Sequence, residues 1–218
     1  MEILYLDQWL MVVNKPAGLL TIQDGYDIAA PHMRQLLEPE YGRCWIVHRL
    51  DKGTSGTLLL ARTKESHRLL SIMFESRAIK KEYRAVIVGK PAEKGFKIAL
   101  PLRVDADRHH RTRVDTEKGK PAVTEIEVLA SNENFSLVVA RPHTGYTHQI
   151  RAHLAHMHFP IVGDELYQGI YPNDTMHLPG SEHGLALHAY ALTFEHPITH
   201  VVLESHAPTP AWFEDLVK

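Results

Sequence analysis

The stretch from His48 to Gly56, HRLDKGTSG, holds the residues in this chain that are best suited to chemistry. Asp51 directly follows an apolar run that ends at Leu50, and a loop of small residues comes after it. A carboxylate at the end of a strand can act as a nucleophile or a general base, and glycines in the adjoining loop let a ligand or another backbone approach closely. A lone aspartate in such a place is more often a turn residue that bonds to its own backbone. Taken alone, Asp51 leaves both interpretations open.

This stretch is one of several segments in the chain that resemble motifs of a single protein family. HRLDKGTSG resembles the HRLD-x-x-TSG signature of the RluA-type RNA pseudouridine synthases, with every defining position present. The other segments that resemble motifs of this family, in the family's order, are NKPAGL (14–19), Lys81-Glu82-Tyr83, TGYTHQIR (144–151), GDELY (163–167) and Leu187-His188-Ala189. The resemblance therefore runs from about residue 9 to residue 190, nearly the whole chain.

The resemblance implies an isomerase that converts uridine in RNA to pseudouridine. The bond from uracil N1 to ribose C1′ is broken, the base turns, and a new bond forms from C5 to C1′. Because no atom is gained or lost, the reaction needs no cofactor and no metal. Asp51 is the implied catalytic residue, as a nucleophile at C1′ or as a base towards the ribose, and the sequence does not decide between these routes. Arg151 is the implied partner, since a nearby cation favours the charged form of a buried carboxylate.

The family's other site residues also have counterparts here. Tyr83 is implied to stack on the target uracil, and Arg49 to help displace the base from its stack. The remaining residues expected to contact RNA or substrate are Lys15, His48, Thr54, Ser55, Gly56, Arg108, Arg111, Arg113, Tyr146 and His148. Tyr146 departs from the family, which usually has arginine there, so this position lacks a fixed positive charge.

The expected partner is structured RNA, either a tRNA anticodon stem-loop or a ribosomal RNA hairpin. Because the first motif begins near residue 9, we expect no N-terminal S4-like domain and a single catalytic domain over residues 1–218. We expect a monomer without an obligate protein partner. The lone cysteine, Cys44, fits a reducing cytoplasm, and no apolar run approaches the roughly 18 residues that a membrane span needs.

Charge is distributed unevenly along the chain, although its net value is only −2. Residues 77–120 hold 13 Lys/Arg and 6 Asp/Glu, whereas the remaining residues hold 11 and 20. Within this part, the segment from Arg103 to Lys120 is predicted to be a basic loop that touches the RNA backbone. Such phosphate contacts give salt-dependent affinity rather than sequence choice. Without the resemblance, a solvated loop with incidental lysines and arginines explains the charge equally well.

Four alternatives were weighed. His153, His156 and His158 could suit a metal, but no HExxH pattern or cysteine pair accompanies them. Ser55 with His48 could suit a hydrolase, but the G-x-S-x-G elbow is missing. A glycosidase would need a second carboxylate that the sequence does not nominate. The last alternative is an RNA-binding protein of the same fold without activity, which the retained catalytic residues disfavour.

The elements expected to position these residues are mostly strands. Strands are predicted at 3–6, 9–14, 45–50, 57–61, 81–88, 97–100, 123–129 and 136–141, with two more between 185 and 205. Helices are predicted at 31–41, from the N-cap Thr63 to about 77, from about 147 to before Pro160, and at 212–217. The helix that carries Arg151 would turn Ile150, Arg151 and Leu154 towards the core. Strands that follow one another directly predict an α+β fold with a largely antiparallel sheet. The resemblance adds a large mixed sheet flanked by helices, with a central cleft for RNA.

Overall fold

The structure is a computed structural model that describes residues 1–25, 27–167 and 181–218. It divides into two compact units. The first unit comprises Met1–Lys81 and Ala189–Pro208, and the second comprises Glu82–His188 and Thr209–Lys218. The prediction of one catalytic domain over the whole chain stays a prediction.

Strands outnumber helices in the structure, as the sequence predicted. The strands are β1 (Glu2–Leu6), β2 (Leu10–Lys15), β3 (Trp45–Ile46), β4 (Ser55–Ala61), β5 (Lys80–Val88), β6 (Gly95–Ile98), β7 (Leu102–Arg103), β8 (Arg113–Val114), β9 (Thr124–Ser131), β10 (Phe135–Pro142), β11 (Leu187–Glu195) and β12 (Val202–His206). The helices are α1 (Met33–Tyr41), α2 (Lys64–Glu75), α3 (Gln149–His156) and α4 (Ala211–Asp215), with a 3-10 turn at Ser181–His183. The pairs β1–β2, β2–β4, β3–β4, β5–β10, β6–β9, β7–β8, β9–β10 and β11–β12 are antiparallel. Strands thus predominate and most of these pairs join neighbours in sequence, which confirms the predicted α+β class.

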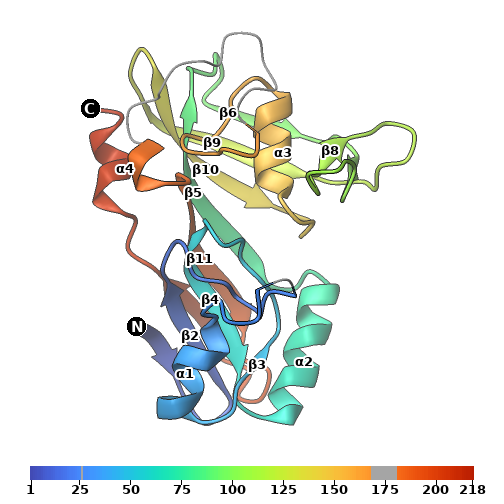
Figure 1. The fold of residues 1–218 in the computed structure, drawn as a ribbon, viewed down its shortest axis with the longest axis vertical. Coiled ribbons are helices and arrows are strands. Elements are labelled where there is room, and N and C mark those ends of the chain that lie inside the picture. The colour runs from blue at the N-terminus through green and yellow to red at the C-terminus, as the bar shows by residue number, and fades with distance from the viewer. Residues whose placement is uncertain (26, 168–180) are drawn as a thin grey trace. The chain divides into compact units, whose positions relative to one another are not determined.

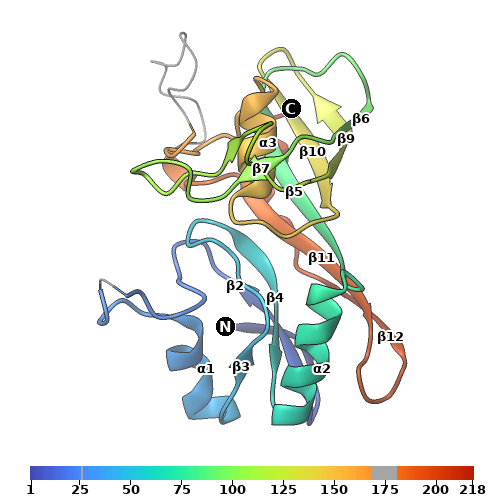
Figure 2. The same ribbon diagram turned by 90° about the vertical axis from the view of Figure 1, so that its right-hand side faces the viewer.

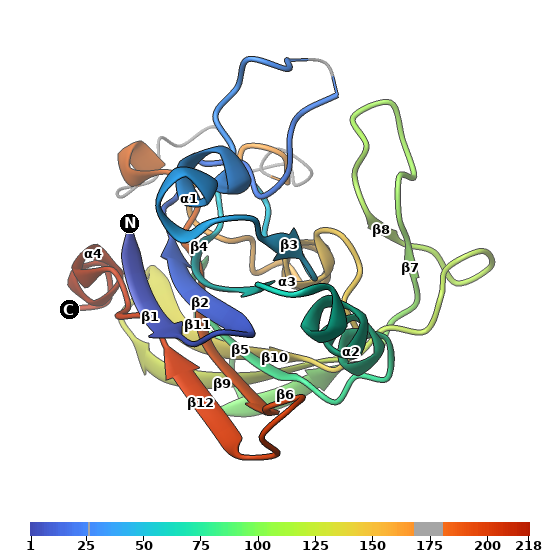
Figure 3. The same ribbon diagram turned by 90° about the horizontal axis from the view of Figure 1, so that it is seen from below.

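The first unit is built on the strand order β1-β2-β4-β11, with β3 paired to β4 and β12 paired to β11. Both faces of β2 and β4 are covered, so these strands are almost entirely buried instead of alternating between core and solvent. Leu10 and Leu59 lie in one apolar cluster with Leu70 of α2. Figure 3 shows β3 lying between α1 and α2. Helix α2 begins as predicted at Thr63, which forms a reciprocal capping box with Ser66.

Strand β3 is shorter than the predicted strand at residues 45–50. It pairs with β4 only through Trp45 and Ile46. At the next position of β4, the Leu59 amide donates to His48 Nε2 instead of to the β3 backbone, and further along the chain Leu50 bonds to Thr21. The Leu50 amide donates to Thr21 Oγ1 at 3.2 Å, and that hydroxyl donates to the Leu50 carbonyl at 2.8 Å. The segment before Asp51 is therefore held by a side chain rather than by a strand ladder.

The second unit is built on the strand order β5-β10-β9-β6. Helix α3 packs on this sheet through Ile150 and Leu154, which share a buried cluster with Val138 of β10 (Figure 1). The short β7–β8 hairpin lies beside α3, as Figures 1 and 2 both show. Among the helices in the described part of the chain, none has the length and apolar character that crossing a bilayer requires.

Candidate active site

Asp51 lies in a tight turn whose backbone is fixed from both sides. The Thr54 amide donates to the Asp51 carbonyl at 3.1 Å, and the Gly18 amide donates to the Lys52 carbonyl at 2.8 Å. Leu50, on the other side of Asp51, is bonded twice to Thr21. Asp51 as a whole residue is partly buried. Asp51 is therefore carried by a backbone with little freedom to move, as a catalytic group requires.

Lys15 supports this turn from inside the unit. Its side chain is 0% exposed, and Nζ donates to the carbonyls of Leu19 at 2.7 Å, Pro16 at 2.9 Å and Lys52 at 3.3 Å. Burial lowers the pKa of Lys15 to about 8, and the nearby Asp51 carboxylate opposes part of that shift. The lysine is thus committed to backbone carbonyls around Asp51. Its predicted contact with substrate stays a prediction.

Gly56 is where the loop after Asp51 returns to the sheet. Its φ of +108° is one that side-chain-bearing residues rarely adopt, and a Cβ there would lie 2.2 Å from the Ala189 carbonyl oxygen. The same oxygen accepts a hydrogen bond from Thr57 Oγ1 at 3.0 Å. The expectation that a glycine of this motif allows a close backbone approach is confirmed for Gly56. Thr54 is buried, and Ser55 is partly buried.

His48 is a neutral structural side chain in this unit. Its Nε2 accepts a hydrogen bond from the Leu59 amide at 2.9 Å, and its ring stacks on Phe74 with 4.5 Å between centroids. Burial lowers the pKa of His48 to about 3, and the Lys81 cation adds to the effect. Any contact between His48 and RNA would therefore be uncharged near neutral pH. Its neighbour Arg49, in contrast, is exposed.

In the second unit, Arg151 is held by two residues of the GDELY motif. Its Nε donates to Asp164 Oδ2 at 2.8 Å and its Nη2 donates to Asp164 Oδ1 at 2.7 Å. The two side chains are only 9% and 0% exposed. The guanidinium carbon also lies 5.2 Å from the centre of the Tyr167 ring. The Asp164 carboxylate fixes one edge of the guanidinium in the geometry of a strong bidentate pair. The Tyr167 ring covers one face of it.

The sequence analysis assigned no role to Asp164 or Tyr167, although both lie in the GDELY segment that resembles a family motif. The presence of an acid and a tyrosine in that segment is the sequence feature that could have pointed to them. Asp164 Oδ1 also accepts from the amides of Leu166 at 3.2 Å and Tyr167 at 3.3 Å. The carboxylate therefore orders its own turn and Arg151 together.

The TGYTHQIR segment folds around Gln149, the first residue of α3. The Gln149 side chain accepts from Thr144 Oγ1 at 2.7 Å and from the Tyr146 amide at 3.2 Å, and it donates to the Val123 carbonyl at 2.9 Å. Helix α3 starts two residues later than predicted because His148 takes a left-handed φ of 56°. Ile150, Arg151 and Leu154 are buried, as the sequence predicted.

The residue that departs from the family, Tyr146, packs against an apolar cluster. That cluster contains Leu102, Ala152 and Tyr167. Two residues further along the chain, His148 meets Tyr167 edge-on, with 5.9 Å between the ring centroids. Tyr146 therefore contributes packing at this position, and its predicted contact with substrate stays untested.

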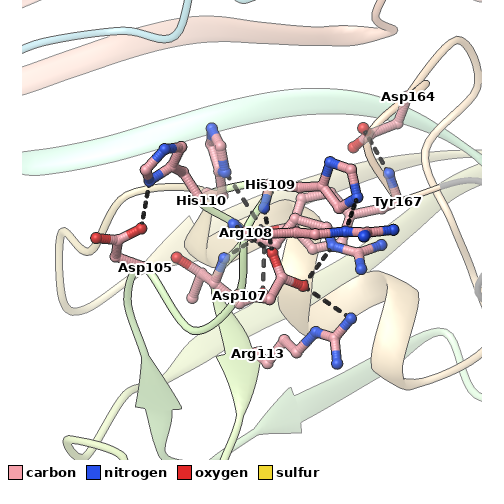
Figure 4. Close-up of polar contacts among 11 residues, drawn as sticks. Asp105, Asp107, Arg108, His109, His110, Arg113, Asp164 and Tyr167 are labelled. Atoms are coloured by element: carbon pink, nitrogen blue, oxygen red, sulfur yellow. Dashed lines mark hydrogen bonds and ion pairs between the residues drawn. The ribbon is translucent and has the colours of Figure 1, made fainter.

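The segment predicted as a basic loop is a structured hairpin whose charge is partly neutralised. Asp107 accepts from Arg111 Nε and Arg113 Nη2, each at 2.8 Å (Figure 4). Burial alone would raise its pKa, but hydrogen bonds from Arg111 and from the His109 and Arg111 amides lower the pKa of Asp107 to about 2. Arg108 remains exposed. The loop is thus ordered by its own acidic residue.

His153, one of the histidines considered as a metal ligand, has both ring nitrogens bound to protein groups. Its Nδ1 lies 2.8 Å from Thr124 Oγ1 and its Nε2 lies 3.0 Å from the Leu100 carbonyl. In the ranges that the structure describes, no group of three or more His, Cys, Asp or Glu side chains is placed to hold a metal.

The remaining predicted residue, Tyr83, lies on β5 opposite Ala140 of β10 and packs against the core of the second unit. Tyr83 and Arg151 thus belong to the second unit, and Asp51 belongs to the first. The pairing of Asp51 with Arg151 stays a prediction.

Comparisons with known proteins identify the family of this chain. Residues 9–156 match the model of the RNA pseudouridylate synthase family. The dual-specificity RNA pseudouridine synthase RluA of Pasteurella multocida is 37% identical over 213 residues, covering 95% of this chain and 93% of its own. The Escherichia coli K12 protein with that name is 38% identical over 196 residues, covering 89% and 87%. The solved structure of human RNA pseudouridylate synthase domain containing 4 has a TM-score of 0.79 at 26% identity, covering 99% of this chain and 91% of its own. The chain therefore belongs to the RNA pseudouridylate synthase family, and it is an isomerase that acts on uridine in RNA.

Proposed function

We propose that Asp51 is the catalytic residue of this enzyme and that Arg151 keeps its carboxylate ionised. Tyr83 stacks on the extruded uracil, and Arg49 helps to displace the base from its stack. The observation that carries this proposal is the fixed guanidinium of Arg151, which is buried and bonded twice to Asp164. A buried cation with an enforced orientation is suited to stabilise a nearby carboxylate, whereas a mobile surface arginine is not.

The reaction follows from a carboxylate in such a site. Asp51 attacks C1′ or removes a ribose proton, and the bond between C1′ and uracil N1 breaks. After the base has turned, C5 bonds to C1′, and either the bond from Asp51 to C1′ breaks or the ribose takes back the proton that Asp51 removed. The C5 proton then leaves to solvent, and N1 takes up a proton. Atoms and electrons balance without a cofactor. Because the target base must leave its stack first, aromatic and cationic side chains that replace the stacking lower the cost of extrusion.

The proposed substrate is a structured RNA, either a tRNA anticodon stem-loop or a ribosomal RNA hairpin. The name of the bacterial relatives, dual-specificity RNA pseudouridine synthase, favours more than one target. Exposed Arg108 on the ordered β7–β8 hairpin is suited to bind the RNA backbone. We further propose that the enzyme works as a monomer in the cytoplasm, where its single cysteine stays reduced.

The test is tritium release from RNA labelled at uracil C5. The wild-type enzyme is expected to release tritium, and Asp51→Asn is expected to release none while it retains its fold and RNA affinity. Asp27→Asn, which alters an exposed acid of the same unit, is the matched control. Residual Asp51→Asn turnover within about tenfold of wild type would contradict the assignment. RNA binding by an inactive wild type would instead indicate a binding protein. Carbodiimide-dependent sequencing of RNA from a deletion strain then identifies the target uridine.

A further inference from the structure

The β7–β8 hairpin and Arg151 meet at one buried side chain, Tyr167. The Tyr167 hydroxyl accepts from the Thr112 amide and donates to the Thr112 carbonyl, at 2.9 Å each. The other side of this residue is the ring that lies 5.2 Å from the Arg151 guanidinium carbon. Tyr167 is only 2% exposed, so the ring cannot move without disturbing its neighbours. A rigid side chain thus joins the hairpin backbone to the charged group of the site.

Thr112 lies in the part of the hairpin that carries the charge. Its neighbours along the chain, Arg111 and Arg113, both bind Asp107. Thr112 itself is buried, and its hydroxyl donates to the Thr147 carbonyl at 2.6 Å, close to the start of α3. A change in the arginine–aspartate cluster must therefore reach Thr112, and through Thr112 it reaches both Tyr167 and the backbone that leads to Arg151.

We propose that Tyr167 is a positioning residue that couples RNA binding at the β7–β8 hairpin to the orientation of Arg151. The inference rests on the proposed function, and it adds a role for the hairpin beyond affinity. When RNA phosphates engage the cluster around Asp107, the two hydrogen bonds at Thr112 transmit the adjustment to the Tyr167 ring. The ring in turn sets the tilt of the guanidinium that Asp164 holds by its edge. Part of the RNA-binding energy is thereby used to align the site.

Tyr167→Phe isolates the hydroxyl because it keeps the ring beneath Arg151. At saturating RNA we expect the single-turnover rate to fall at least about tenfold, while the dissociation constant for RNA stays within about threefold because the hairpin cations remain. Tyr5→Phe, which removes a hydrogen-bonded phenol hydroxyl in the first unit, is the control. An unchanged rate in Tyr167→Phe, or an equal loss of affinity, would overturn the coupling.

A double-mutant cycle separates coupling from a merely structural effect. Asp107→Ala disrupts the hairpin cluster and is expected to lower the saturating rate in the wild-type background. In the Tyr167→Phe background it should lower that rate by a clearly smaller factor, since only the contact between Thr112 and the Thr147 carbonyl then remains. If Asp107→Ala lowers the rate by the same factor in both backgrounds, the two residues act independently and the proposal is wrong.

A third measurement holds even if Tyr167→Phe does not fold or the enzyme finds no substrate. The Arg151 Nε–H resonance, assigned by its loss in Arg151→Lys, is followed in ¹⁵N-arginine-labelled protein. Asp107→Ala, in the hairpin cluster, is expected to shift it, whereas Arg34→Ala on α1 should not. If the chemical shift of the Arg151 Nε–H resonance is the same in Asp107→Ala as in the wild type, the coupling is refuted. A wild type that releases no tritium refutes the proposed function instead, so the two failures are distinguishable.

Discussion

Arg151 and Asp164 form a buried ion pair in which two parallel hydrogen bonds, 2.8 and 2.7 Å long, join the guanidinium edge to the carboxylate. Removing one member of such a pair leaves an uncompensated buried charge, which is far more costly than losing a surface salt bridge. Arg151, the proposed partner of Asp51, is therefore also an essential part of the second unit's interior. Its position depends on an acid 13 residues away in the chain.

Asp164→Asn tests this relationship because it preserves the shape of the side chain and removes its charge. We expect the free energy of unfolding to fall by about 3–5 kcal/mol. The single-turnover rate should fall by about 100-fold, since the guanidinium loses its enforced orientation. Urea denaturation and tritium release measure the two effects. Glu165→Gln, an exposed acid next in sequence, is the control, and a variant that matches it in both assays would show that the pair is dispensable.

Gly56→Ala should destabilise the first unit through one misplaced methyl group. The added Cβ would collide with the Ala189 carbonyl, and the backbone would be held at an unfavourable positive φ. The two effects together should cost about 2 kcal/mol or more. Gly25→Ala is matched to it in chemistry and unit, but its Cβ meets open space. Thermal unfolding of the two variants should therefore differ clearly, and equal midpoints would rule out the close approach.

Lys15 should give the folded protein a distinctive alkaline pH dependence. Its pKa in the folded state is about 8, below the 10.5 of an ordinary lysine, so the unfolded chain binds more protons between these two pH values. The free energy of unfolding should therefore rise with pH across this window, by up to about 3 kcal/mol relative to Lys15→Met. Urea denaturation of both proteins at several pH values gives this difference directly. A difference that stays constant from pH 8 to 10.5 would show that Lys15 titrates normally.

Arg108 should contribute to RNA affinity mainly through salt-dependent phosphate contact. It is exposed on the hairpin, whereas Arg111 and Arg113 are bound to Asp107. Arg108→Ala is expected to make the plot of log affinity against log salt concentration shallower by about 0.9. Filter binding at several salt concentrations gives the slope. Arg34→Ala on α1 should leave the slope unchanged, and an equally steep plot for Arg108→Ala would remove that residue from the RNA contact.

The sequence by itself located most elements, and its resemblance to a family nominated the residues proposed for catalysis. The apolar run before Asp51, the capping signal at Thr63 and the helical spacing of Ile150 and Leu154 are local features, and local features follow from backbone propensity and periodicity. The same reasoning extended β3 too far, because hydrophobic content does not reveal that Leu50 bonds to the Thr21 side chain.

Only the tertiary structure decided which charges are internal and which remain exposed. It placed the Lys15 ammonium among backbone carbonyls, gave Arg151 its partner in Asp164, and showed that Asp107 binds two of the three arginines expected to contact RNA. Composition counts charges, but ion pairing depends on distance, direction and exclusion of water, and these are set only when segments distant in the chain fold against one another.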